Sequence, residues 1–541
     1  MILALLSSLL MALSQLTPLG FLVLVGYVPL ILATHRLPPG KVFKLVFAAT
    51  VAQYLATLYW LTITMNVFAH LPWVVSWFAL FLLTMLIACY LAGAAALARY
   101  LSIRLGWSYF ALFPVTLCVT EYLRDYGFIG SFPWGASAYS LLSVPVLLQG
   151  ASVGGVFGLV FYVGLVNAGI ASVIVRRKMC WGALFVSVAL VAYGLSRLWS
   201  YQPETQKNVK VALLQGNIEQ GIKNHAPQYG DEILERYSNL QNKAVSLGAQ
   251  IVIWPESSYP YRLDMQRPIL NNLGTLAPVN IISALGTDAQ RDFYNTAYVL
   301  DQSGTILGRF DKNYLVPFGE YVPWPFGYVV EKIVPNLGSF ARSGGFKTVM
   351  ADGIPLAVTI CYEGVFPVIG RAFVAEGAEL LINVTNDAWY GVSAGPYQHL
   401  GMYQMRSVEV GRSYARATNT GVSAWVDSRG FIHQPTNLYE EALVLAEVPL
   451  SKEITIYQQV GDIFPLSCLA ILLIGLIISR RPSTKGQWAM ALIGLAIILT
   501  SHGYFAGDKK AFDESAYTKD SLFIILGLLI GLRVFTDRRK K

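Results

Sequence analysis

Residues 355–363 have the sequence Pro-Leu-Ala-Val-Thr-Ile-Cys-Tyr-Glu, a largely apolar run that ends in a cysteine, a tyrosine and a glutamate. An apolar run of this length, rich in β-branched residues, is typical of a strand whose two faces are both buried. In α/β sheets, ligands gather at the carboxyl ends of such strands. The run therefore predicts an α/β domain in which Cys361 lies at a functional edge of a sheet.

Two further stretches place ionisable residues at or after predicted strands. Ile251-Val252-Ile253-Trp254-Pro255-Glu256 ends in Glu256, and residues 310–320 contain Lys312 and Glu320. Helices are predicted at 228–247 and 398–414. Other β-rich runs lie at 208–214, 249–253, 279–285, 296–300, 379–384 and 421–426. Alternating strands and helices favour sheets covered by helices, with 320–345, rich in Pro, Gly and aromatics, as a long surface loop.

The rest of the chain is too apolar for a soluble fold. Of its 541 residues, 55% are hydrophobic and 13% charged, against roughly 25% charged in soluble domains. A membrane helix needs about 20 apolar residues. Candidate spans are two in 1–33, then 45–65, 72–98, 107–123, 148–175, 179–197 and 463–479, with weaker ones at 487–501 and 520–535. We expect a bundle of about seven spans in 1–200, an extracytoplasmic catalytic domain in 201–458 and about three spans in 459–541.

The distribution of positive charge predicts the orientation. The net charge is +8, and the Lys and Arg residues gather in the connections at 36–44, 99–104, 176–178, 480–485 and 538–541. Basic connections stay in the cytoplasm. An odd number of predicted spans separates 36–44 from residue 200, so the polar domain lies outside the cytoplasm. No basic stretch is interleaved with stacking aromatics, which argues against nucleic-acid binding.

Cysteine and histidine usage narrows the chemistry. Only Cys361 of the five cysteines lies in the polar domain, which excludes an internal disulfide there, and no Cys/His grouping has zinc-ligand spacing. The domain's histidines, His225, His399 and His433, adjoin none of the three stretches. A cysteine–histidine pair stays open but unsupported.

A glutamate, a lysine and a cysteine brought together can form a nucleophilic site. A free thiol has a pKa of ~8.5 and attacks well only as the thiolate. A nearby carboxylate can take the thiol proton, and an ammonium favours the thiolate and stabilises an oxyanion. Taken singly, Cys361 is more often an inert core residue, and Glu256 and Lys312 are more often solvated. The prediction of a nucleophilic site rests on the occurrence of all three residues together.

The three stretches resemble the nitrilase superfamily, whose catalytic Glu, Lys and Cys occur in this order and these contexts. With the flanking spans, nearly the whole chain resembles the membrane-embedded branch of that superfamily, the apolipoprotein N-acyltransferase family. The matching motifs are VALLQGNI (211–218), WPES (254–257), LVPFGEYVP (315–323), ICYE (360–363), NVTNDAWYG (383–391), GPYQHL (395–400), RATNTGVSA (416–424), GD (461–462), TEYLR (120–124) and FPW (132–134). The resemblance implies an αββα sandwich.

The resemblance also implies residue roles. Glu256 is expected to be the general base, Lys312 the oxyanion stabiliser and Cys361 the acylated nucleophile. The implied supporting residues are Glu320 and Glu363, which orient Lys312 and the surroundings of the thiol; Tyr362, whose N–H joins the oxyanion hole; Asn295; and Val316 and Phe318, which line the acyl pocket.

By the same resemblance, the enzyme takes an acyl chain, that of the sn-1 position, from a membrane phospholipid. A cysteine thioester carries this chain to the α-amino group of a diacylglyceryl-modified N-terminal cysteine of apolipoproteins, with no metal or organic cofactor. The expected location is the bacterial inner membrane, with the catalytic domain on the periplasmic side.

Two departures and two alternatives stay open. Asn224 stands where some family members carry a Trp, and 487–541 adds an apparent hairpin of spans to the family's usual end. One alternative is a membrane-tethered amidase or nitrilase that acts on a small soluble amide. Another is a non-catalytic scaffold or transporter, for which Glu121 in a predicted span is the clearest, if thin, support.

Overall fold

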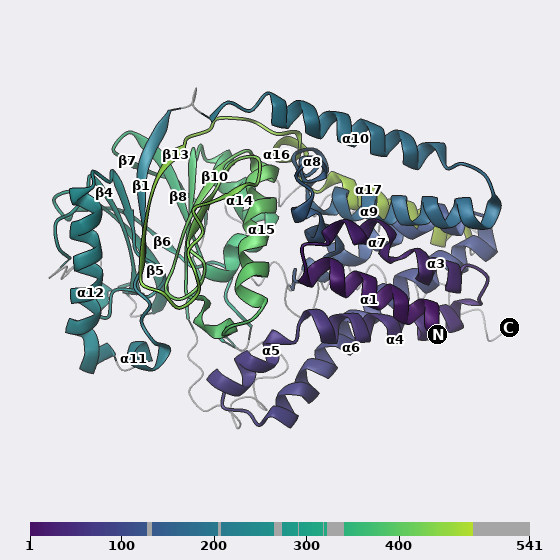
Figure 1. Ribbon diagram of the computed structural model, residues 1–541, viewed down its shortest axis with the longest axis horizontal. Coiled ribbons are helices and arrows are strands. Elements are labelled where there is room, and N and C mark those ends of the chain that lie inside the picture. Colours follow the sequence, from purple (N-terminus) through teal and green to yellow (C-terminus); the bar gives the residue numbers. More distant parts are fainter. Residues whose placement is uncertain are drawn as a thin grey trace.

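The computed structural model describes residues 1–126, 132–203, 207–224, 226–264, 273–289, 292–317, 319–321, 340–343 and 345–479. Phe318, most of the predicted loop at 320–345 and the predicted hairpin at 487–541 lie outside these residues. An α/β part and a helical part lie end to end (Figure 1).

The described residues of the α/β part form two sheets. The first has the order β13 (Ala442–Pro449), β1 (Asn208–Gln215), β2 (Ile251–Ile253), β4 (Val279–Thr287), β5 (Phe293–Asp301) and β6 (Ile306–Asp311), with β3 (Arg262–Asp264) on β4. The second has the order β12 (Ile432–His433), β11 (Ala424–Val426), β10 (Ser413–Thr418), β9 (Leu380–Thr385), β8 (Ile354–Ile360) and β7 (Val349–Ala351). β1, β2 and β4 run parallel, as do β8, β9 and β10.

Helices cover the outer faces of both sheets. α12 (Ala226–Ser246) covers the first sheet, and α14 (Pro367–Ala375) and α15 (Gly395–Val410) cover the second (Figure 1). Residues of the two inner faces, such as Ile253 and Val358, share one buried core. The expected α/β fold and its αββα layering are confirmed.

The helix predicted at 398–414 extends beyond the end of the observed helix, α15. α15 ends at Val410 because Gly411, at φ 62°, adopts the left-handed conformation that stops a helix. Ser413 then opens β10, which pairs in parallel with β9. The predicted strands at 208–214, 279–285, 355–361 and 379–384 match β1, β4, β8 and β9, since their apolar runs are buried on both faces.

The helical part packs around its own core. Its elements are α1 (Ile2–Leu16), η1 (Gly20–Leu22), α2 (Val23–Gly26), α3 (Val28–Thr34), α4 (Pro39–Thr57), α5 (Trp60–Ile63), η2 (Thr64–Phe68), α6 (Trp73–Leu105), α7 (Tyr109–Asp125), η3 (Ser137–Ser143), α8 (Pro145–Leu148), α9 (Ala151–Arg176), α10 (Trp181–Trp199), α16 (Ile456–Val460) and α17 (Ile463–Ser479). Short elements of the α/β part are α11 (Gln220–Asn224), η5 (Cys361–Val365) and η6 (Asp387–Tyr390).

Among the described residues, three helices are long and apolar enough to cross a membrane: α6, α9 and α10. α4 with the α5–η2 segment makes a fourth candidate that bends by 58°, so the predicted span 45–65 is broken. α1, Gly20–Thr34 and α17 are apolar but shorter. The expected counts of about seven and about three spans stay predictions.

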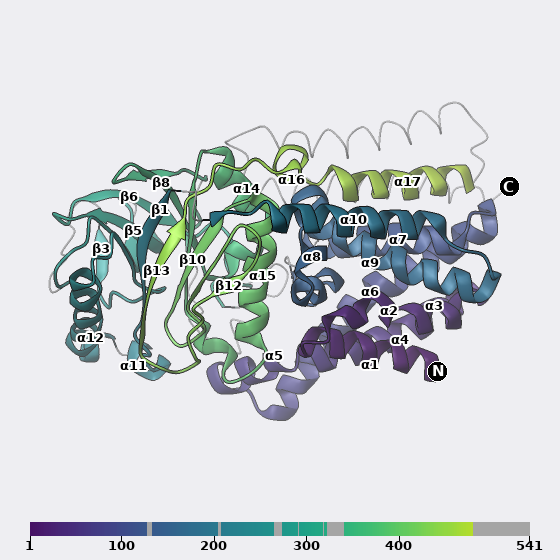
Figure 2. The same cartoon turned by 45° about the horizontal axis from the view of Figure 1, so that its top comes forward.

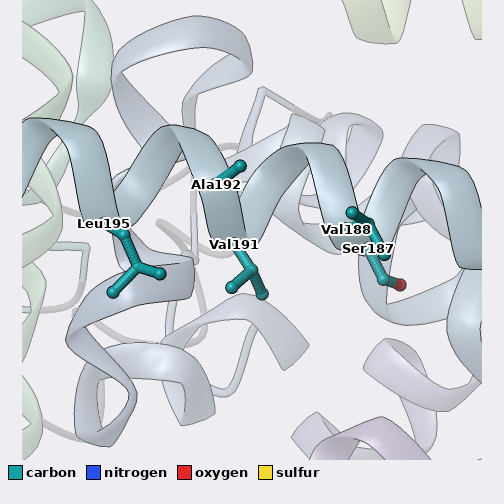
Figure 3. Close-up of a pocket in the computed structure, with 5 residues that line it drawn as sticks. All are labelled: Ser187, Val188, Val191, Ala192 and Leu195. Atoms are coloured by element: carbon teal, nitrogen blue, oxygen red, sulfur yellow. The ribbon is translucent and has the colours of Figure 1, made fainter.

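α10 presents apolar side chains to its surroundings, as a lipid-facing helix does. Figure 3 shows a shallow pocket lined by Ser187, Val188, Val191, Ala192 and Leu195, all from α10. All five side chains lie on the helical part, so this pocket is separate from the three stretches singled out in the sequence.

α15 joins the two parts. Its Met405 and Val408 lie in the core of the helical part. Its Glu409 accepts a hydrogen bond from the backbone N–H of Val156 at 2.7 Å, where Gly155 (φ 63°, ψ −170°) breaks α9. A carboxylate of the α/β part thus caps a helix of the other part, which fixes one against the other.

Candidate active site

Three strand ends converge at one edge of the sandwich. Glu256 follows β2, Lys312 follows β6 and Cys361 follows β8. Cys361 has a φ of 52°, so the chain turns sharply from β8 into η5 at this residue. Left-handed backbone at a non-glycine residue is strained and clusters at functional sites.

Lys312 is held between two carboxylates. Its Nζ lies 2.9 Å from Glu320 Oε1 and 3.4 Å from Glu256 Oε1, and its side chain is 1% exposed. Asn295 Nδ2 donates to Glu256 Oε1 at 2.7 Å and to Glu320 Oε1 at 3.2 Å. Burial alone would lower the pKa of Lys312, but Glu320 and Glu256 outweigh it and raise that pKa well above its usual value. The ammonium is therefore charged at neutral pH.

The thiol of Cys361 lies within the electrostatic reach of this cluster and is 7% exposed. Burial, followed by the Glu256 charge, raises its pKa to about 12, although Lys312 and a hydrogen bond with Thr385 oppose the shift. Lys312 therefore acts in the expected direction, toward the thiolate, but burial and Glu256 outweigh it in the resting site. The proton must leave during attack, which requires a base.

Glu363 contacts backbone rather than the lysine. Its carboxylate accepts hydrogen bonds from the N–H of Ile360 at 2.9 Å and of Asn313 at 2.8 Å. Burial raises its pKa to about 7, and these N–H groups oppose the rise. Because Ile360 precedes the nucleophile and Asn313 follows Lys312, Glu363 ties the two strand ends together.

The remaining expected residues surround this cluster. Val316 donates its backbone N–H to Glu320 Oε2 at 2.8 Å, and its side chain packs against the core. The Tyr362 ring stacks on Trp134 with centroids 5.7 Å apart and planes 5° apart. Trp134 belongs to the FPW motif of the helical part, so that part reaches the residue next to the nucleophile.

Two buried charges hold the segment that carries Trp134. Glu121 accepts hydrogen bonds from the backbone N–H of Ser137 at 3.1 Å and from its hydroxyl at 2.9 Å. Arg124 donates to the hydroxyl of Tyr54 at 2.5 Å, and that hydroxyl donates to the carbonyl of Gly135 at 3.1 Å. Glu121 therefore has a structural task, and its support for a transporter is lost.

The end of β9 contributes residues to which the sequence analysis gave no role. Asn386 donates its backbone N–H to Glu256 Oε2 at 2.9 Å. Thr385 hydrogen-bonds the Cys361 thiol. The signal was present in the NVTNDAWYG motif, because its Thr385 and Asn386 directly follow the predicted strand at 379–384.

Asp387 anchors this strand end in a buried network. Arg416 Nη2 lies 2.7 Å from its Oδ2, and His399 Nδ1 lies 2.9 Å from its Oδ1. Burial would raise the pKa of Asp387, but Arg416, then His399, hold it at about 2. Burial and Arg416 lower the pKa of His399, while Asp387 opposes that shift.

Replacing Asp387 by asparagine is expected to lower the Tm in a pH-dependent way. The folded pKa of Asp387 is about 2, below the ~3.9 of an unfolded aspartate. Its stabilisation, about 2 kcal/mol, is complete above pH ~4 and fades as the pH falls toward 2. The gap in Tm between wild type and Asp387→Asn should therefore shrink over that window. Thermal melts in detergent from pH 6 to pH 2 measure it, with the exposed Asp352→Asn as control; a gap that is independent of pH contradicts the assignment.

Family models match the two parts of the chain. The carbon-nitrogen hydrolase model matches residues 210–457. The apolipoprotein N-acyltransferase N-terminal domain model matches residues 7–169.

Among the described residues, no group of three or more His, Cys, Asp or Glu side chains is arranged to hold a metal.

Curated relatives agree with these models. The apolipoprotein N-acyltransferase of Geobacter metallireducens is 36% identical over 87% of this chain and 93% of its own length. That of Shewanella oneidensis is 34% identical over 77% of this chain and 84% of its own. Among solved structures, a mutant of the Nesterenkonia AN1 amidase, from the nitrilase superfamily, matches 47% of this chain and 94% of its own with 20% identity and a TM-score of 0.35.

Proposed function

The chain belongs to the apolipoprotein N-acyltransferase family, and from that premise we propose how it N-acylates lipoproteins. Its acyl donor is a membrane phospholipid, and its acceptor is the α-amino group of an N-terminal diacylglyceryl-cysteine. The observation that carries the proposal is the buried Lys312, set between Glu256 and Glu320 beside the Cys361 thiol.

In the first step, Glu256 takes the proton of Cys361 as Sγ attacks the ester carbonyl of the donor. The Lys312 ammonium and the backbone N–H of Tyr362 stabilise the oxyanion. The tetrahedral intermediate collapses to a thioester, and the lysophospholipid leaves as its alcohol with the proton that Glu256 returns. Because the resting thiol has a pKa of about 12, proton removal and attack are coupled.

In the second step, the acceptor amine attacks the thioester. Glu256 takes a proton from the attacking nitrogen, and the thiol of Cys361 reforms as the amide is released. Glu320 orients Lys312, while Asn295 and the N–H of Asn386 orient the Glu256 carboxylate. Val316 lies beside this cluster, as a residue of the acyl pocket would.

An apolar elbow of the helical part adjoins the site. Thr64 Oγ1 donates to the carbonyl of Trp389 at 2.8 Å, and Trp60 Nε1 donates to Gln398 Oε1 at 3.0 Å. The elbow, defined here as residues 57–78, exposes large apolar side chains: Val67, Trp73, Val74, Trp77 and Phe78. This surface suits lipid acyl chains and is continuous with the loop that follows Asn386.

The catalytic domain lies on the periplasmic side of the bacterial inner membrane. The α9–α10 connection, which carries Arg176, Arg177 and Lys178, lies at the end of the helices away from the sheets (Figure 1). Basic connections mark the cytoplasmic side, which supports the proposal that the sheets lie on the opposite, periplasmic side.

The decisive experiment incubates the purified enzyme with phosphatidylethanolamine and a diacylglyceryl-modified lipoprotein peptide. The N-terminal peptide should gain the mass of one acyl chain, as measured by mass spectrometry. An unchanged peptide, together with ammonia released from small amides, would favour an amidase instead.

A further inference from the structure

Lys223 is a second cation at the active site, and the reaction proposed above does not use it. It lies on α11, and its Nζ donates to the backbone carbonyl of Glu256 at 2.9 Å. The side chain is partly buried. Among the described residues, its ammonium has no carboxylate in ion-pair contact, so only a neutral oxygen receives its charge.

The helix that carries Lys223 is tied to the catalytic residues. Asn386 Nδ2 donates to Gln220 Oε1 at 2.7 Å, while the backbone N–H of Asn386 holds the Glu256 carboxylate. α11 and α5, which belongs to the elbow, also lie at the same edge of the sheets, the lower one in both views (Figures 1 and 2). The ammonium is thus held next to the general base, on the side where the apolar elbow meets the domain.

The described residues stabilise this ammonium poorly. Burial lowers the pKa of Lys223 to about 8, even though the Glu256 charge opposes the shift. That opposition disappears when Glu256 takes the thiol proton, which leaves Lys223 facing a neutral acid and a carbonyl. A buried ammonium without an anion is costly, and a phosphate oxygen is a partner that lysine binds well as a point charge.

The two lipid substrates differ in whether they carry a phosphate. In a glycerophospholipid, the sn-3 carbon carries an anionic phosphate, two carbons away from the sn-1 ester. The diacylglyceryl group of the acceptor carries a thioether at that carbon and no phosphate. A cation beside the general base therefore distinguishes donor from acceptor.

We propose that Lys223 binds the phosphate of the phospholipid donor and so selects the donor in the first step. This inference rests on the proposed function. The phosphate then lies on the Glu256 side of the thiol, with the ester carbonyl at Cys361. In the second step this position stays empty of phosphate, and Lys223 contributes nothing to the attack by the amine.

The test separates the two half-reactions of Lys223→Gln in the full-length enzyme. Acyl-enzyme formation from phosphatidylethanolamine, followed by intact mass, should fall about tenfold in kcat/KM. Transfer from the preformed acyl-enzyme to a diacylated peptide should stay within about twofold. Diacylglycerol, which has the same ester but no phosphate, should acylate variant and wild type equally. Lys223→Arg should retain most of the phospholipid rate.

Lys210→Gln is the matched control, because the Lys210 ammonium also donates to a single backbone carbonyl, that of Leu247, at 2.9 Å. Equal slowing of both half-reactions would show that Lys223 only positions Glu256, and would overturn the proposal. So would slowing with diacylglycerol, or no change at all. A wild type that forms no acyl-enzyme would instead refute the proposed function itself.

Discussion

Replacing Cys361 by serine should abolish the acyl-enzyme and reduce N-acylation on the order of 10⁴-fold or more, as removal of a nucleophile does. The serine hydroxyl is a much weaker nucleophile than the thiol, and the site offers Glu256 as its base rather than a histidine pair. The covalent intermediate is measured as a hydroxylamine-labile acyl group after incubation with labelled phosphatidylethanolamine.

The matched control for this variant is Cys89→Ser, which changes an exposed thiol in α6 of the helical part. It should label as the wild type does. Serine is close to cysteine in size, so the fold should tolerate it at Cys361, whose side chain is 7% exposed. Normal labelling of Cys361→Ser would remove the basis of the proposed function.

Lys312→Met should lower the rate of acyl-enzyme formation by about 10²–10³-fold, the loss usual for one oxyanion donor. It should also lower the Tm, because removing one partner of a buried ionic cluster costs about 3–5 kcal/mol. The physical cause is that Glu256 and Glu320, both hydrogen-bonded to Asn295, then face each other without a cation. Single-turnover acylation and thermal melts in detergent give the two quantities.

A double variant separates stability from catalysis. Lys312→Met with Glu320→Gln removes the uncompensated charge, so the Tm should recover while acylation stays low. Arg309→Met serves as the control on the same strand, because Arg309 pairs with Asp311 at 2.7 Å; it should acylate at close to the wild-type rate. Recovery of acylation in the double variant would contradict the role of Lys312 as oxyanion stabiliser.

Much of the fold was predictable because its signals are local. Strands buried on both faces require continuous apolar runs, which is why β1, β4, β8 and β9 were recognised. The error at 398–414 arose because a turn at Gly411 separates α15 from β10, although the segment remains buried across it. The break in the predicted span 45–65 likewise depends on how α5 and η2 pack, with Phe68 set against Trp389.

For the site, the sequence alone predicted which ionisable side chains come together. Glu256, Lys312 and Cys361 each follow a predicted strand, and strand ends are where an α/β sheet exposes ligand-binding groups. Tertiary structure decided the hydrogen-bond partners and the pKa values of those groups. Asn386 and Glu256 are 130 positions apart in the sequence, so their hydrogen bond leaves no local trace. The high pKa of the Cys361 thiol comes first from burial. Desolvation and long-range hydrogen bonds depend on which atoms surround a group after folding, and no stretch of neighbouring residues encodes that.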